Sequence, residues 1–104
     1  MEIKKIFWTD TARNQLEDIF NYYKEKANLK SSKNLVIKLI DRTIQLENNP
    51  LSGPIEPLLQ DRKFEYRYLV EGNYKIIYWI EDNYVKIASI FDCRQNPIKM
   101  KKIK

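Results

Sequence analysis

The chain has 104 residues, one cysteine, two glycines and no histidine, and it carries a net charge of +5 with a sequence pI near 9.3. This length predicts one domain with a single core, and the composition excludes glycine-rich phosphate loops, internal disulfides and histidine-based catalysis or metal binding. No segment reaches the roughly 18 apolar residues of a membrane span, and the N-terminus is too short and charged for a signal peptide. We therefore expect a cytoplasmic protein with no membrane partner.

The first part of the chain predicts a strand and a helix. Residues 3–8 (IKKIFW) combine β-branched and aromatic side chains, which favours a strand. Thr9 or Asp10 follows as a helix N-cap. Apolar residues then recur at steps of three and four, the spacing of an amphipathic helix: Ala12, Leu16, Ile19, Phe20, Tyr23 and Ala27.

A second helix is predicted to begin with Ser31 or Ser32 as its N-cap and to end before Pro50, which cannot continue a helix. Its apolar stripe consists of Leu35, Val36, Leu39, Ile40, Thr43 and Leu46. Because few residues separate the two helices, we expect them to form an antiparallel hairpin.

Three runs rich in β-forming residues follow a proline-containing loop: 63–70 (KFEYRYLV), 74–80 (YKIIYWI) and 84–91 (YVKIASIF). The separators EGN and EDN are typical of tight turns, so the runs predict an antiparallel meander. The sequence thus predicts an α+β fold in the order β-α-α-β-β-β, with an N-terminal helical hairpin on one face of a small, mainly antiparallel sheet.

Residues 1–104 are expected to form one domain that ends in a basic tail from about residue 95. Its cations are Lys99, Lys101, Lys102 and Lys104. Disorder is the default expectation for such an end, although a protein partner could order it.

Two-residue turns at 72–73 and 82–83 would fix which side chains share a face of the sheet. Tyr68 is then opposite Ile77, Trp79 is opposite Lys86, and Lys75 is opposite Ile90. One face is apolar and should receive the helices: Leu69, Tyr74, Ile76, Tyr78, Ile80, Val85, Ile87 and Phe91. The second face mixes rings with cations: Tyr66, Tyr68, Lys75, Ile77, Trp79, Lys86 and Ala88.

If strand geometry continues, Asp92 and Arg94 also lie on the second face, with Arg94 across from Lys75. Aromatic side chains can stack on bases and cations can hold phosphates, so this face could bind nucleic acid. Tyr, Trp and Arg are equally enriched in protein interfaces, and a plain solvated sheet face is the third interpretation. Arg62 and Lys63 open the second strand and could extend a phosphate track.

Several segments together resemble the RelE/ParE superfamily of bacterial toxin–antitoxin toxins. They are FWTDTARNQLEDIFNYY (7–23), LENNPLSGP (46–54), YRYLVEGNYKIIYWI (66–80) and VKIASIFDCRQNP (85–97). The resemblance implies the β-α-α-β-β-β fold and a toxin of a type II, plasmid-stabilising system that is held inactive by a cognate antitoxin. An acidic, amphipathic antitoxin segment would suit the charge of +5, and a hetero-oligomer of the two proteins is expected.

The resemblance implies one of two targets. RelE-like members cleave mRNA on the ribosome with cations of the sheet face and often a C-terminal tyrosine, and ParE-like members inhibit DNA gyrase by binding. Lys75 and Arg94 match two of the RelE-like cations. However, Tyr66 and Tyr68 stand where RelE-like members place lysines, and Met100 stands where they often place the tyrosine.

RNA cleavage requires a base for the 2′-hydroxyl, an acid for the leaving oxygen and cations for the phosphorane. Arg94 and Lys75 could supply only the cations, because arginine stays protonated. Tyr66, Tyr68 or Lys63 could replace the missing base, but each ordinarily titrates near pH 10. We therefore expect a ParE-like toxin that acts by binding, without cofactor or metal.

The sequence leaves two alternatives open: a ribosome-dependent mRNA endonuclease, and a non-toxic interaction module of the same fold. The expected binding residues are Arg94, Lys75, Tyr66, Tyr68, Trp79, Lys86, Arg62 and Lys63.

Overall fold

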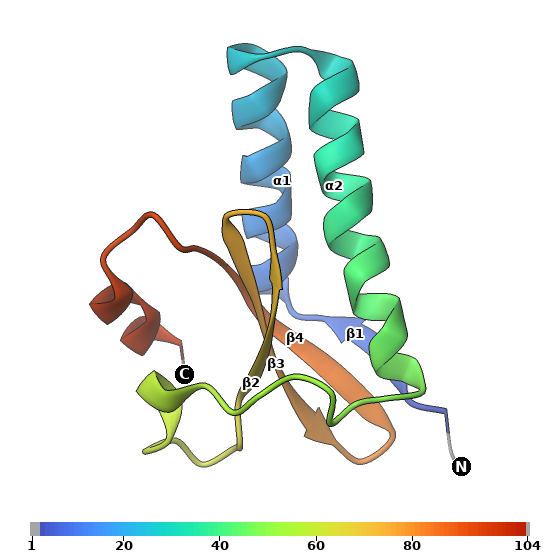
Figure 1. Ribbon diagram of the computed structural model, residues 1–104, viewed down its shortest axis with the longest axis vertical. Helices are drawn as coiled ribbons and strands as arrows, with labels where there is room; N and C mark the ends of the chain where they lie inside the picture. The colour runs from blue at the N-terminus through green and yellow to red at the C-terminus, as the bar shows by residue number, and fades with distance from the viewer. Residues whose placement is uncertain (1–2, 104) are drawn as a thin grey trace.

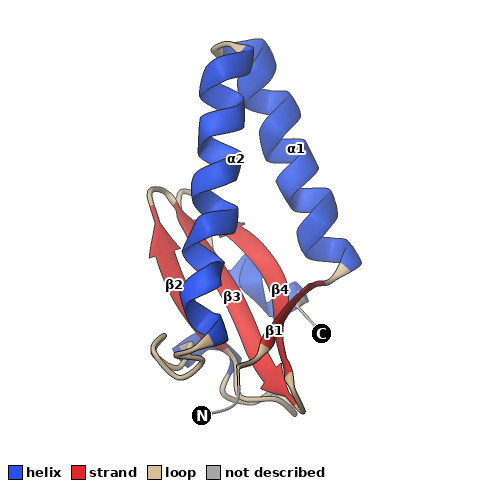
Figure 2. Cartoon of the chain, turned by 90° about the vertical axis from the view of Figure 1, so that its right-hand side faces the viewer, coloured by secondary structure: helices blue, strands red, loops and turns tan. Residues whose placement is uncertain are grey.

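Two long helices lie side by side on one face of a four-stranded sheet, and short helical turns lie against the other face (Figures 1 and 2). The structure is a computed structural model that describes residues 3–103. Its main elements follow the predicted order: β1 (Lys5–Trp8), α1 (Asp10–Lys26), α2 (Leu29–Ile44), β2 (Arg67–Glu71), β3 (Tyr74–Glu81) and β4 (Tyr84–Asp92). Three 3-10 turns complete it: η1 (Gln45–Glu47), η2 (Pro57–Leu59) and η3 (Pro97–Lys102).

Helices α1 and α2 each begin at a polar side-chain cap. Thr9 accepts the N–H of Ala12 and so caps α1, as predicted. Helix α2 begins earlier than predicted, because the Asn28 side chain accepts the N–H of Ser31 at 2.8 Å. Ser32 is instead buried inside α2, where its hydroxyl donates to the Phe20 carbonyl of α1 and ties the two helices together. Within residues 3–103, no helix is both long and apolar enough to cross a membrane.

The strand order is β1-β4-β3-β2, with β1 parallel to β4 and the other pairs antiparallel. The predicted pairs of Tyr68 with Ile77 and of Trp79 with Lys86 are confirmed. Beyond Tyr78 the register of β3 and β4 shifts, so that Ile77 is opposite Ser89 and Lys75 is opposite Phe91. The predicted pairing of Lys75 with Ile90 is therefore wrong.

The shift is a β-bulge at Ala88, and it reverses the facing of the end of β4. One extra residue in a strand moves every later side chain to the opposite face. Ile90 consequently packs in the helix-side core, whereas Phe91 packs on the second face, contrary to the prediction for Phe91.

The sheet carries a hydrophobic core on each face. The helix-side core holds Ala12, Leu39, Leu46, Leu69, Tyr74, Ile76, Tyr78, Val85, Ile87 and Ile90. The second-face core holds Leu59, Tyr66, Ile77, Ala88, Phe91 and Met100, with Ile103 packed against it. The second face is thus partly covered by η2 and η3 rather than open.

The basic tail is ordered over its described part, which corrects the default expectation of disorder. Residues 97–102 form η3, Asn96 caps it, and Met100 is 2% exposed against the sheet. The burial of Met100 and Ile103 offsets the entropy of ordering a lysine-rich segment. Lys104, the last predicted cation of the tail, lies outside the described residues.

Candidate functional site

Lys75 lies within an internal ion pair instead of on an open face. Its ammonium lies 2.7 Å from Oε1 of Glu56 and 4.2 Å from the ring centroid of Tyr68. Glu56 is 1% exposed and comes from the loop before η2, so the pair fastens that loop to β3. Lys75 and Tyr68, two candidates for catalysis, thus lie together, but the cation is already neutralised.

Three other predicted residues, Tyr66, Trp79 and Lys86, lie together on the second face. The rings of Tyr66 and Trp79 meet edge to face at 5.7 Å, and the Lys86 ammonium is 5.8 Å from the Trp79 ring. Lys86 pairs with Glu81 at 3.2 Å, and the Trp79 indole donates to the same carboxylate, which lowers the pKa of Glu81. Tyr66 is 2% exposed, and burial raises the pKa of its phenol.

Arg62 and Lys63 lie beside this group on the segment that leads into β2. Arg62 forms an ion pair with Asp61 at 3.6 Å and donates to the Lys101 carbonyl, so it binds η3 to the loop. The Lys63 ammonium lies 5.7 Å from the Phe64 ring centroid.

Arg94 lies on the helix side of the sheet, and its predicted place across from Lys75 is wrong. Because of the bulge, Asp92 is opposite Tyr74, a residue of the helix-side core. Arg94 follows it and binds the Asp92 carboxylate through Nε at 3.0 Å and Nη2 at 2.8 Å, and it donates to the Tyr23 hydroxyl of α1 at 3.2 Å. The structure therefore separates the two cations that the nuclease interpretation needs together.

The phenols of Tyr23 and Tyr74 continue this helix-side cluster. A hydrogen bond from Tyr74, followed by that from Arg94, lowers the pKa of Tyr23. Burial and the bond with Tyr23 raise the pKa of Tyr74. The tyrosine with the lowered pKa thus lies on the opposite face from Lys75.

The contacts of Arg94 predict that the Asp92 carboxyl contributes to stability in a way that depends on pH in the acid range. The hydrogen bond from the guanidinium, reinforced by the backbone N–H of Arg94, holds the pKa of the Asp92 carboxyl below its usual value against the effect of burial. A carboxyl with a lowered pKa stabilises the fold above its unfolded pKa of about 3.9, and this contribution is lost as the pH falls through the lowered pKa.

In Arg94→Ala, we expect the pKa of Asp92, measured by carboxyl-carbon NMR, to rise toward the ordinary value. The stability difference between wild type and variant should vanish in acid. Identical Asp92 titrations in the two proteins would contradict this assignment, and Arg13→Ala, which removes an exposed pair with Asp10, is the matched control.

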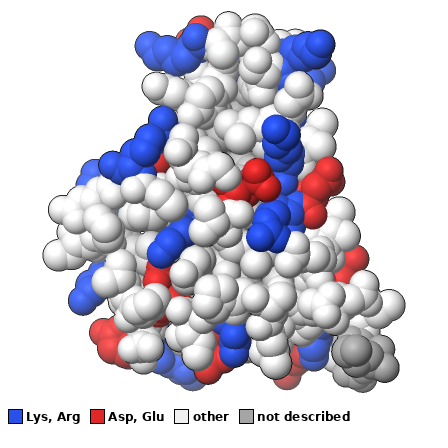
Figure 3. Space-filling view, viewed as in Figure 1, with Lys and Arg blue, Asp and Glu red and all other residues white. Residues whose placement is uncertain are grey.

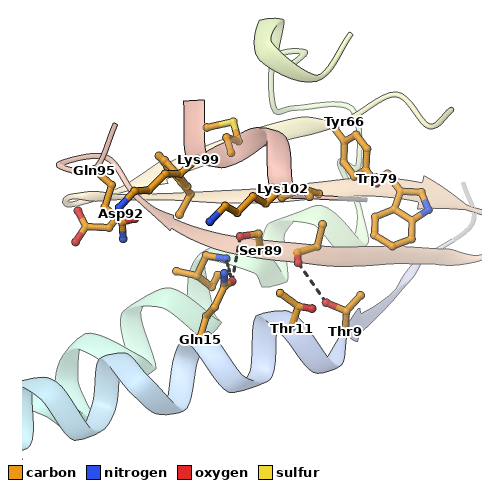
Figure 4. A pocket seen from close by; sticks show the side chains of 15 residues that line it. Thr9, Thr11, Gln15, Tyr66, Trp79, Ser89, Asp92, Gln95, Lys99 and Lys102 are labelled. Carbon is orange, nitrogen blue, oxygen red and sulfur yellow. Dashed lines mark hydrogen bonds between the residues drawn. The ribbon is translucent and has the colours of Figure 1, made fainter. Parts of the chain in front are cut away.

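Two adjoining hollows run along the C-terminal half of β4, where β1 no longer pairs with it. The larger, about 600 Å³, lies between α1 and η3, and the smaller, about 470 Å³, lies beside Arg94. Figure 4 shows Tyr66 and Trp79 at one end of the larger hollow, Asp92 and Gln95 at the other, and Lys99 and Lys102 between them. We call this larger hollow the β4 groove.

Gln15 of α1 closes the free edge of β4 inside the groove. Its Oε1 accepts the backbone N–H of Ile90 at 2.8 Å and the Ser89 hydroxyl at 3.0 Å (Figure 4). Thr9 likewise donates to the Ile87 carbonyl at 2.7 Å. These side chains satisfy polar groups of β4 that β1 leaves unpaired.

Most of the candidate cations already have an acidic partner. Arg62, Lys75, Lys86 and Arg94 each form an ion pair, and acidic and basic side chains alternate over the face in Figure 3. In contrast, Lys99, Lys101 and Lys102 of η3 form no ion pair with any described residue. Among residues 3–103, no cluster of acidic or cysteine side chains could hold a metal ion.

Sequence reasoning did not identify Glu56, Gln15 or Phe7 as part of these arrangements. Glu56 lies between two prolines and gives no local signal of its burial. For Phe7 the sequence does contain a signal, because side chains alternate between faces along the first strand. In the structure Phe7 is opposite Lys86 and shares the second face with it.

Comparison with known proteins assigns the family. The model of the ParE toxin of type II toxin-antitoxin system, parDE, matches residues 6–97. A structure of the chromosomal ParDE TA system from P. aeruginosa is similar, with a TM-score of 0.72 and 15% identity, over 86% of this chain and 96% of that one. A YoeB dimer from Staphylococcus aureus has a TM-score of 0.55 and 22% identity, over 84% and 93%.

No curated protein matches the sequence significantly. The two solved structures establish the likeness of the fold, and the family model covers most of the chain, from within β1 through both helices and the other three strands to Arg94 and beyond. The chain therefore belongs to the ParE toxin family of type II toxin–antitoxin systems.

Proposed function

We propose that this protein is the toxin of a plasmid-stabilising pair, that a cognate antitoxin neutralises it in the cytoplasm, and that it stops growth by binding DNA gyrase. The family match supports the toxin role. The neutralised state of the predicted catalytic cations supports binding rather than cleavage, and it is the observation on which this choice of target depends.

A phosphorane intermediate needs cations that are free to approach it. Lys75 instead pairs with buried Glu56, and Arg94 pairs with Asp92 on the other face. Burial also raises the pKa of Tyr66, one of the residues considered as the general base, away from neutrality. A binding toxin needs none of these groups.

The outer side of α2 supports a helical antitoxin segment as partner. Four aliphatic side chains, each between 37% and 53% exposed, recur at near-helical spacing: Leu29, Ile37, Ile40 and Ile44. Ile40 was predicted in the core stripe, but it faces solvent. An exposed apolar row flanked by Lys30 and Lys33 suits an amphipathic segment with acidic residues at its margins.

A gyrase supercoiling assay tests this proposal. The purified protein should inhibit supercoiling of relaxed plasmid at micromolar concentration, and the protein encoded by the adjacent reading frame should relieve the inhibition. The double variant Ile37→Glu, Ile40→Glu should still inhibit gyrase but should no longer be relieved. Lys38→Glu, which adds a similar charge on α2, serves as the control.

Absence of inhibition at about 10 µM, a concentration at which even an interface of −7 kcal/mol is substantially occupied, would reject gyrase as the target. Cleavage of ribosome-bound mRNA by the same preparation would favour the endonuclease alternative. Expression without a growth defect would favour the non-toxic module.

A further inference from the structure

A row of aromatic rings crosses the exposed part of the second face. Phe7 and Tyr84 meet edge to face at 6.3 Å, and Phe64 stacks on Trp79 at 5.3 Å with an interplanar angle of 25°. The Lys86 ammonium lies between these two pairs, 5.7 Å from the Phe7 ring and 5.8 Å from the Trp79 ring. We call Phe7, Tyr84, Trp79 and Phe64 the aromatic row.

The row is accessible, although its rings are large and apolar. Phe7 is 48% and Tyr84 is 39% exposed, while Trp79 and Phe64 are half-buried. Because all four rings could have been buried at a gain of free energy, their exposure on a sheet indicates a ligand that offers flat apolar surfaces.

The β4 groove continues the row, since Trp79 belongs to both. Beyond Trp79, the groove holds the Lys102 and Lys99 side chains and the hydrogen-bonding groups of Gln15 and Ser89 (Figure 4). Its volume of about 600 Å³ can hold a flat heterocycle. The lysines have no acidic partner among the described residues, so they remain available to an anion.

We propose that the aromatic row and the β4 groove together bind single-stranded nucleic acid. Unpaired bases stack on Phe7 and Trp79, and phosphates are held by Lys99 and Lys102, which form no ion pair with a described residue. A row of rings that leads into ammonium groups without an acidic partner among the described residues fits a strand that offers both bases and phosphates. A duplex keeps its base faces stacked against one another, so they are not available to the exposed rings. The inference does not depend on gyrase being the target.

Fluorescence anisotropy with labelled oligouridylate and oligothymidylate of about 12 nucleotides tests the proposal. We expect micromolar binding of both single strands and at least tenfold weaker binding of a duplex of the same length. With two lysine–phosphate contacts, raising salt from about 50 to about 200 mM should weaken binding by about sevenfold. Binding of the duplex as tightly as the single strands would overturn the proposal, because net charge alone would then explain the attraction.

Variants distinguish binding at the aromatic row and the β4 groove from non-specific attraction by the net positive charge. Phe7→Ala should weaken binding at least fivefold, the lower bound for losing one stacked base, and so should Lys99→Gln combined with Lys102→Gln. The controls remove an exposed ring and an exposed charge on the helices, Tyr22→Ala and Lys38→Gln. Because the Phe7 side chain is about half exposed, Phe7→Ala should still fold, and its melting temperature checks this. Wild-type affinity in both row and groove variants, or no binding by the wild type at about 100 µM, would refute the site.

Discussion

Replacing Lys75 with methionine should lower the free energy of unfolding by about 3 kcal/mol, at the lower end of the cost of breaking a buried ion pair. The reason is the carboxylate that remains. Glu56 is 1% exposed, Lys75 holds its Oε1, and its Oε2 has no hydrogen bond within the described residues. Without the ammonium, this charge would be buried and unpaired. Urea unfolding at neutral pH measures the loss.

Replacing the acidic partner of the pair should lower the free energy of unfolding by less. Glu56→Gln leaves Lys75, whose side chain is 24% exposed and can turn toward water, so we expect a loss of about 1 kcal/mol. The double variant Lys75→Met, Glu56→Gln should recover much of the stability that Lys75→Met loses. Equal losses in the two single variants, or no recovery in the double variant, would show that the pair does not hold the loop to β3.

Gly53→Ala should be similarly damaging, at about 3 kcal/mol, through steric overlap. The backbone of Gly53 lies against Tyr78, whose hydroxyl accepts the Gly53 N–H at 3.0 Å and donates to the Pro50 carbonyl at 2.7 Å. An added Cβ would lie 2.7 Å from that hydroxyl and closer still to the Tyr68 carbonyl. The loop would have to move away from the sheet and lose both hydrogen bonds of a fully buried tyrosine.

The chain's other glycine is the matched control. Gly72 lies in the β2–β3 turn with φ of +58° and no atom within 4 Å of an added Cβ, so Gly72→Ala costs only the left-handed backbone strain of about 1 kcal/mol. Thermal unfolding of both variants gives the comparison. If Gly72→Ala were the more damaging of the two, overlap with Tyr68 and Tyr78 would not be what requires glycine at position 53.

The fold could be predicted from sequence because its periodicities are strong. The apolar stripes of α1 and α2, and the EGN and EDN turns, determine two helices and a meander without any tertiary information. The family resemblance, based on segments spread over the chain, is confirmed by the family model over residues 6–97.

The candidate site was harder to predict than the fold, because the facing of its residues depends on one bulged residue of β4, Ala88. The bulge at Ala88 has no clear sequence signal, and it reverses Phe91, Asp92 and with them the place of Arg94. Because side chains of a strand alternate between faces, one inserted residue changes the facing of every residue after it. The prediction is therefore right at Trp79 and Lys86 and wrong beyond the bulge.

Tertiary burial explains the other differences. Nothing local distinguishes Glu56 from a solvated loop carboxylate, and its pairing partner is 19 residues away. The same holds for the tail, where Met100 and Ile103 join the second-face core and order a segment whose composition is typical of disorder. Both features become visible only when the loop, the tail and the sheet are placed together.

We propose that this toxin acts by binding and not by cutting RNA. Induced expression in growing bacteria, followed by measurement of the DNA damage response and mapping of mRNA 5′ ends, tests it most directly. We expect growth arrest with an induced DNA damage response and intact transcripts. Cleavage of translated mRNA at fixed codon positions, abolished by Arg94→Ala, would contradict it.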